Sequence, residues 1–145
     1  MGLYWEPCPG GARLLRLLGD TPCPAVPGTI EGLPVAELGP YCFADRPVRP
    51  GARRTGDDTH EITGNFVEEV TLPDTVRVLD SAAFYNCRRL RRVTLGPGVE
   101  GLLYCYDNRY VKFLKQKPSP HLLSSKKIHH PHLSPSPHCC PEQIH

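Results

Sequence analysis

The sequence predicts an α/β solenoid, in which short parallel strands and short helical or 3₁₀ turns wind into stacked coils. The first observation behind this prediction is a repeat of 23 residues. It relates four pairs of apolar residues, which are Val70 and Val93, Leu72 and Leu95, Val76 and Val99, and Leu79 and Leu102. The second is the motif SAAFYNC, whose small and aromatic residues suit one helical or 3₁₀ turn. The third is composition, because 17 prolines and 13 glycines among 145 residues indicate many turns and little long helix.

Bulk composition fits one modest globular domain, with 39% hydrophobic and 22% charged residues. The formal net charge of +2 is unevenly distributed. Residues 1–114 hold 13 Lys and Arg against 14 Asp and Glu, whereas residues 115–145 hold 4 against 1. The body of the protein is therefore close to neutral, which gives no general argument for nucleic-acid binding.

The first third of the chain is expected to open the solenoid. Residues 3–18 read as a short hairpin, because PCPGG supplies a turn between LYWE and ARLLRLL. The segment 12–45 reads as a longer, variant first repeat, with five extra residues near EGLPV. Its alignment on the later repeat pairs Pro27 with Pro73, Thr29 with Thr75, Ile30 with Val76, Leu38 with Leu79, and Phe43 with Phe84.

Residues 46–65 read as an exposed insertion between two coils, since they carry charge, Gly and Pro with almost nothing to bury. Their DDTHE cluster is interpreted as a solvated loop rather than a metal or acid/base site, because its carboxylates lack apolar neighbours that would exclude water. The repeats proper then occupy residues 66–103.

The C-terminal part departs from the repeat, because position 107 holds Asp107 where the period calls for the aromatic seen at Phe84. The segment 102–114 alternates around Asp-Asn and is predicted to form a hairpin that caps the last coil of a 1–114 solenoid domain. Residues 115–145 hold six Pro, five Ser and six His, so they are expected to form a disordered tail.

The repeat also assigns side chains to the two faces of the strands. Val67, Val70 and Leu72 in the first copy, and Leu90, Val93 and Leu95 in the second, are expected to point into the core. The residues between them face solvent and form the candidate protein-binding strip, which consists of Glu68, Glu69, Thr71, Arg91, Arg92 and Thr94. Because parallel strands lie about 4.8 Å apart, a shift of one period should place Glu68 beside Arg91 and Glu69 beside Arg92.

Two motifs allow a more specific function beside a plain structural role. The cluster CRRLRR could form a nucleic-acid patch, but two of its four arginines have acidic neighbours and no aromatic residues are interleaved for base stacking. Cys87 could be a nucleophile, but His60 is the only histidine before the tail and lies in the insertion, so Cys87 reads as a small core residue.

Cysteine usage and the N-terminal sequence point to the cytoplasm. Seven cysteines form an odd set without CxxC spacing, which predicts reduced thiols rather than a disulfide framework or a zinc ribbon. The start, MGLYWEPCPGG, lacks the charged and apolar regions of a signal peptide, and no apolar run approaches the about 18 residues of a membrane helix.

The segment VTLPDTVRVLDSAAFYNCRRLRRVTL resembles the leucine-rich repeats of the BspA-like, bacterial surface-antigen type. A first block, VPGTIEGLPVAELGPYCF, is similar to the variant opening repeat of such proteins, so the resemblance covers about residues 12–103. The matching positions are Pro73 after the strand, the small-small-Phe motif Ala82, Ala83 and Phe84, then Cys87, and Leu90-x-x-Val93-x-Leu95. The resemblance implies a right-handed α/β leucine-rich-repeat solenoid that binds proteins through its exposed strand face, without catalytic residues. Where the family has Gly before the small residues, the second block has Asp80. Family members usually carry more repeats and often export signals, so the resemblance also allows a cell-surface location.

The leading functional hypothesis is therefore a non-enzymatic protein-interaction module without cofactor or metal, with no nucleic-acid or membrane partner. An enzyme ranks lower, since the sequence shows no nucleophile–base pair, phosphate loop or paired carboxylates. The array holds about two and a half repeats where about three are usual, so it is expected to be truncated and to self-associate through an exposed end. Two alternatives stay open: a non-functional fragment of a longer repeat protein, and weak metal binding by the tail through His129, His130, His132, His138, Cys139 and Cys140.

Overall fold

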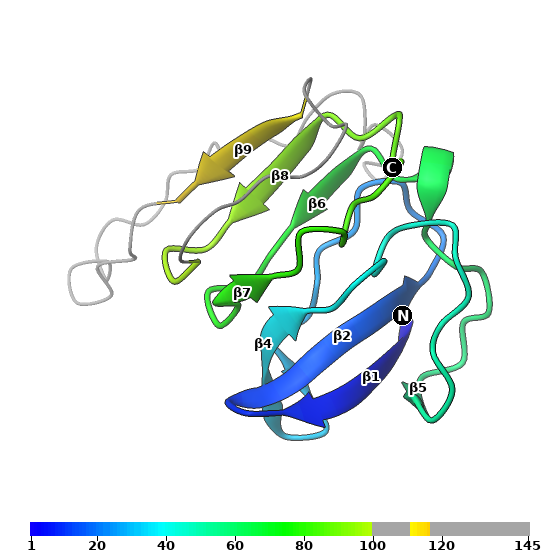
Figure 1. The fold of residues 1–145 in the computed structure, drawn as a ribbon, viewed down its shortest axis with the longest axis vertical. Coiled ribbons are helices and arrows are strands. Elements are labelled where there is room, and N and C mark those ends of the chain that lie inside the picture. The colour runs from blue at the N-terminus through cyan, green and yellow to red at the C-terminus, as the bar shows by residue number, and fades with distance from the viewer. Residues whose placement is uncertain (100–110, 117–145) are drawn as a thin grey trace, which may run out of the picture.

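The computed structural model describes residues 1–99 and 111–116, and strands dominate this part of the chain (Figure 1). The elements are β1 (Gly2–Cys8), β2 (Gly11–Leu18), β3 (Thr29–Ile30), β4 (Leu33–Leu38), β5 (Arg53–Thr55), η1 (Gly64–Phe66), β6 (Glu69–Thr71), β7 (Val78–Leu79), β8 (Arg92–Leu95) and β9 (Lys112–Lys115). The single-turn 3₁₀ helix η1 is the only helix among the described residues. The architecture is thus a β-solenoid-like arrangement of about four turns, rather than the α/β form expected from the sequence.

Three parallel strands form the sheet that carries the repeat, in the order β6, β8, β9. Val70 pairs with Val93 and Thr71 with Thr94, which confirms the register predicted from the period of 23. The next step is shorter, because Val93 pairs with Phe113 after 20 positions. A fourth rung precedes β6, where Val26 N–H donates to the Thr71 carbonyl at 2.9 Å and Thr71 N–H donates to that of Pro24 at 3.1 Å. We call residues 22–26 the proline rung.

The second sheet connects the N-terminal hairpin to the coils. β1 and β2 pair in an antiparallel hairpin, as the sequence predicts, and β2 then pairs with β4 in parallel. β4 also pairs with β7, with Leu38 opposite Leu79, which agrees with the pairing of these two residues in the alignment of the first repeat on the later one. In Figure 1 the hairpin lies at one end of the solenoid, so it covers the first coil.

The core is a column of apolar side chains shared by successive coils. Leu72 and Leu95 are 3% and 2% exposed, and the rings of Phe43 and Phe84 stack with centroids 5.2 Å apart and planes 8° from parallel. All six side chains expected to point inward from the two VTL segments are buried, namely Val67, Val70, Leu72, Leu90, Val93 and Leu95. Stacking of identical rows therefore closes the interior, as a repeat that cannot bury its own face requires.

The wall opposite the repeat sheet consists of linked turns instead of a helix. Ala83 N–H donates to the Asp80 carbonyl at 3.0 Å, and Tyr85 N–H donates to that of Ala82 at 3.1 Å. The Asp80 carboxylate accepts a bond from Ala82 N–H at 2.8 Å, which explains how aspartate serves this turn. Asn86 then adopts a left-handed conformation with φ of 59°, which ends the turn before a helix can continue.

The segment 46–65 is more ordered than its composition predicts. Its strand β5 pairs with β1, and Ile62, which donates its N–H to the Leu17 carbonyl at 3.0 Å, is fully buried. The guanidinium of Arg16, only 1% exposed, bonds this segment through Glu61. Most residues of the segment are exposed, as the sequence predicts, but the free edge of β1 supplies backbone partners that order it without a hydrophobic pattern.

The C-terminal expectations fall mostly outside the described residues. Of the predicted capping hairpin at 102–114, the structure describes Val111 onward, where β9 is a parallel strand beside β8. Of the predicted tail at 115–145, it describes Lys115, the last residue of β9, and Gln116.

Replacing Gly11 by alanine is expected to lower the free energy of unfolding by about 1–3 kcal/mol. Gly11 has φ of 145°, and an added Cβ would collide with the Pro34 carbonyl oxygen, so the hairpin could not approach β4. Urea denaturation measures the change. Gly32→Ala is the matched control, because Gly32 also has a positive φ, of 85°, but its Cβ would meet nothing within 4 Å. Equal losses in the two variants would show that backbone conformation alone matters at Gly11.

Candidate functional site

The candidate protein-binding strip is positioned by two adjacent parallel strands. On β6 and β8 the alternation of side chains buries Val70 and Val93 and turns Glu69, Thr71, Arg92 and Thr94 to the outer face. Glu68 and Arg91 precede the two strands by one residue, and Arg91 N–H donates to the Glu68 carbonyl at 2.8 Å. The structure thus brings all six residues of the strip together.

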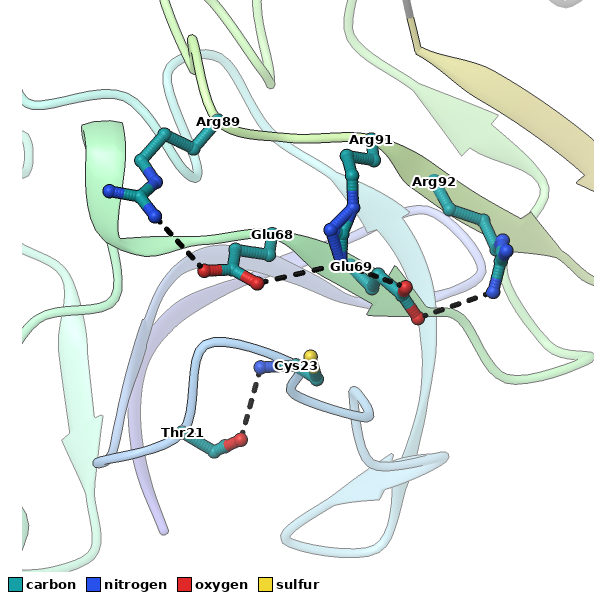
Figure 2. A network of polar contacts seen from close by, with 7 residues as sticks. All are labelled: Thr21, Cys23, Glu68, Glu69, Arg89, Arg91 and Arg92. Carbon is teal, nitrogen blue, oxygen red and sulfur yellow. Dashed lines mark hydrogen bonds and ion pairs between the residues drawn. The ribbon is translucent and has the colours of Figure 1, made fainter. Parts of the chain in front are cut away.

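Ion pairs connect the charged residues of the strip across the two strands (Figure 2). The guanidinium of Arg91 lies 3.5 Å from the Glu68 carboxylate and 3.2 Å from that of Glu69, while Arg92 lies 3.5 Å from Glu69. Both predicted neighbour pairs are confirmed. Arg89 adds a fifth charge, 3.6 Å from Glu68, which the sequence did not assign to the strip.

The acidic and basic members of the strip differ in exposure. The Glu68 and Glu69 side chains are 20% and 14% exposed, whereas those of Arg91 and Arg92 are 39% and 41% exposed. Arginine head groups therefore dominate what this face presents to solvent. Arg92 is also incompletely bonded, because its Nε atom is buried without a hydrogen-bond partner in the described part of the chain.

Strand β9 extends the same face with residues that the sequence did not assign to it. Lys112 pairs in register with Arg92, and Leu114, which is 45% exposed, pairs with Thr94. The signal that could have identified this strand is the sequence VKF, in which the apolar Val111 and Phe113 flank the basic Lys112. It was missed because its spacing from β8 is 20 residues instead of 23.

The cysteines of the described region are buried, hydrogen-bonded or disulfide-bonded, or partly exposed as at Cys8. Cys87 is buried, and its Sγ donates to the Phe43 carbonyl at 3.1 Å, which agrees with its interpretation as a core residue. Burial strongly raises the pKa of Cys42, so this thiol stays protonated. Cys23 is disulfide-bonded, which corrects the expectation of reduced thiols at that position. Cys8, Cys42 and Cys87 are free.

The DDTHE cluster is used in contacts that hold the hairpin. The Asp58 carboxylate forms an ion pair with the N-terminal amino group at 3.0 Å, and the Glu61 carboxylate forms one with the Arg16 guanidinium at 2.6 Å. His60 lies 3.0 Å from the Gly19 carbonyl and its ring packs on Phe66 with centroids 4.9 Å apart. Across residues 1–99 and 111–116, no three His, Cys, Asp or Glu side chains gather as a metal site would require.

The predicted metal ligands of the tail, from His129 to Cys140, lie outside the described residues. Within the described ranges, no helix is long and apolar enough to span a membrane. Comparison with known proteins identifies no relative: no family of known sequences, no curated protein and no solved structure matches this chain.

Proposed function

We propose that this chain is a non-enzymatic protein-interaction module, a solenoid of the leucine-rich-repeat kind that binds a protein through its outer strand face. The observation that carries the proposal is the alignment of Glu68, Glu69, Thr71, Arg91, Arg92 and Thr94 on one face of adjacent parallel strands. The BspA-like resemblance of the repeat supports the same reading, because those repeats bind proteins through this face.

The energetics of the strip favour recognition over a purely structural role. Exposed ion pairs contribute only about 0–1 kcal/mol each to stability, so four such contacts around two carboxylates are weak as a reason for the fold. A face of mixed charge is well suited to selecting a partner, because mismatched charges are penalised more than matched ones are rewarded.

The double variant Arg91→Glu, Arg92→Glu is expected to abolish capture of the partner in a pull-down, while its circular dichroism spectrum stays that of the wild type. The reason is that both exposed cations of the strip would become anions beside Glu68 and Glu69. Partners are identified by mass spectrometry of proteins retained by the wild-type chain and lost by the variant. Unchanged capture would contradict the proposed strip.

A charge-swapped chain separates binding from folding in this experiment. Glu68→Arg and Glu69→Arg combined with Arg91→Glu and Arg92→Glu restore opposite charges across the strands but reverse the pattern offered to a partner. This chain should match the wild type in thermal stability and still fail to capture the partner. Recovery of capture would show that the double variant had acted through misfolding.

A further inference from the structure

The two edges of the repeat sheet are chemically different. At the first edge, the proline rung contains Pro22 and Pro24, which have no N–H, and their carbonyls already accept bonds from Glu68 and Thr71. The N–H of Cys23 donates to the Thr21 hydroxyl at 3.0 Å (Figure 2). Because the Pro22 and Pro24 carbonyls face β6, the outward groups of this rung belong to Cys23 and Ala25, and one of their two N–H groups is already used by Thr21. An added strand would therefore find few donors at this edge.

At the other edge, the outer side of β9, no residue within 1–99 or 111–116 takes up the outward backbone groups. Lys112 and Gln116 donate their N–H groups to Arg91 and Leu95 of the β8 side, each at 2.9 Å. Because hydrogen-bonding direction alternates along a strand, the N–H and C=O groups of Phe113 and Lys115 point away from β8. No described strand pairs with that side of β9, which Figure 1 shows at the border of the sheet.

The charges on β9 indicate what kind of strand would fit. In the outer row Glu69 neighbours Arg92, and Arg92 neighbours Lys112, so the row reads acidic, basic, basic. Arg92 has its carboxylate at 3.5 Å, whereas no ion pair links Lys112 to any described residue. The next position in this row would accordingly favour a carboxylate. On the inner side, Phe113 is partly buried, with its ring 6.5 Å from Phe84, and would accept an apolar neighbour.

We propose that β9 binds an acidic, extended segment of a partner protein, which adds to the repeat sheet as a further strand. A carboxylate of this segment lies beside Lys112, an apolar side chain covers Phe113, and its backbone bonds to Phe113 and Lys115. This mode of recognition takes affinity from the backbone and specificity from alternate side chains. The inference deepens the proposed function by naming the partner class, but it uses the edge of the sheet instead of the strip.

A second copy of this chain fits the edge less well. Head-to-tail stacking would bring β9 to the proline rung, which offers few donors. Antiparallel pairing of two β9 strands centred on Phe113 would use the free backbone groups, yet it would place Lys112 of each copy beside Leu114 of the other. The lysine charge would then stay uncompensated. An acidic strand pairs with both the backbone groups and the Lys112 charge, so it fits this edge better.

Fluorescence anisotropy with the full 145-residue chain tests the proposal. The probe is a fluorescein-labelled peptide with the sequence Gly-Glu-Val-Glu-Val-Glu-Gly. One control probe carries Lys in place of Glu, and a second carries N-methyl groups on the amides of both valines and no other change. A third control probe is N-methylated at the three glutamates instead. Alternate residues of a strand point their amides toward β9, so one of the two methylated probes blocks these amides whether the peptide pairs parallel or antiparallel. The acidic probe should bind at least about tenfold more tightly than the lysine probe, and one methylated probe should lose this affinity.

Variants locate the contact on the protein. Lys112→Glu should weaken binding of the acidic probe at least about fivefold, whereas Arg77→Glu, the same charge change at an exposed residue beside β7, should leave it unchanged. Lys115→Pro removes an outward N–H and should weaken binding more than Lys115→Ala. Both variants lose the charge and the bond from Lys115 Nζ to the Val99 carbonyl at 2.9 Å, so the difference between them reports on the N–H. Circular dichroism verifies that each variant is folded.

Each alternative outcome would overturn the proposal. If both methylated probes bind as tightly as the unmethylated acidic probe, the peptide is held by charge attraction and does not add as a strand. A concentration-dependent dimer in sedimentation, abolished by Lys115→Pro and indifferent to the acidic probe, would assign the edge to a second copy. The strip is tested separately, because Arg91→Glu with Arg92→Glu changes capture of the partner protein, whereas the methylated probes report only on the edge.

Discussion

Replacing Arg16 by methionine is expected to lower the free energy of unfolding by about 3 kcal/mol. The guanidinium of Arg16 is almost fully buried and donates to the carbonyls of Cys42, Tyr41 and Arg46 at 2.9, 2.9 and 2.7 Å, and to the Glu61 carboxylate at 2.6 Å. Methionine has a similar length but no donor. It would leave three carbonyls without this partner, and each unsatisfied buried group costs about 1–3 kcal/mol, part of which water entry would recover.

The effect is large because one side chain fastens three parts of the molecule. Arg16 belongs to the hairpin, Tyr41 and Cys42 to the end of the first coil, and Glu61 to the segment that follows it. Losing the guanidinium should therefore loosen the segment 46–65 as well as lower the midpoint of unfolding. Hydrogen exchange should show faster exchange of the amide of Ile62, which bonds to the Leu17 carbonyl.

Two variants make this prediction specific, with urea denaturation as the measurement. Arg13→Met removes another arginine of β2, but the Arg13 side chain is 26% exposed and its ion pairs with Glu6 and Glu37 lie near solvent, so about 0–1 kcal/mol is expected. Arg16→Lys keeps the charge but cannot make the forked set of bonds, and its loss should be intermediate. A methionine variant at 16 as stable as that at 13 would refute the role assigned to Arg16.

Arg16 also shows what the sequence could not reveal. Most of its partners are backbone carbonyls 25, 26 and 30 positions away, and a carbonyl leaves no trace in the identity of its residue. Strand β5 was missed for the same reason, since its pairing with β1 relies on backbone groups and its residues are largely exposed. Patterns of apolar and polar residues indicate which side chains are buried. The contacts of Arg16 and β5 depend on the position of backbone groups, which such patterns do not show.

The register of the coils, in contrast, could be read directly. Val70 and Val93 are adjacent because they occupy the same position in two copies of one unit, and equivalent residues of stacked parallel strands become neighbours. The pairing of Glu68 and Glu69 with arginines followed from the same arithmetic. Prediction failed where the unit changed length, at β9, whereas the turn SAAFYNC, expected as one helical or 3₁₀ turn, does form bonds from residue i to i−3.

The face and the edge of the repeat sheet fit together as parts of one surface. The arginines of the strip and Lys112 lie on the same side of the sheet, with Arg92 in register between Glu69 and Lys112. A partner strand at β9 would therefore bring its flanking residues near Arg92, whose Nε has no partner in the described ranges. Contacts at the face could then select among strands that the edge admits.

Replacing Phe84 by alanine is expected to cost about 3–5 kcal/mol of stability, the usual loss for a large buried aromatic. Phe84 is 1% exposed and stacks on Phe43, and its ring centroid lies 6.5 Å from that of Phe113. Its ring therefore connects the core levels above and below its own. A small domain is stable by about 5–15 kcal/mol, so this variant should be the least stable of those considered and partly unfolded near 37 °C. Thermal and urea denaturation measure the loss.

The controls for Phe84 test whether the coils share one core. Val78→Ala, at a side chain that is 48% exposed, should change stability by less than about 0.5 kcal/mol. In a double-mutant cycle, Phe43→Ala and Phe84→Ala should couple by about 0.5–3 kcal/mol, because each ring loses the same stacking partner. Additive losses would mean that the first two coils are stabilised independently. Since the strip and the β9 edge both depend on continuous stacking from coil to coil, additivity would remove the physical basis for a single binding surface.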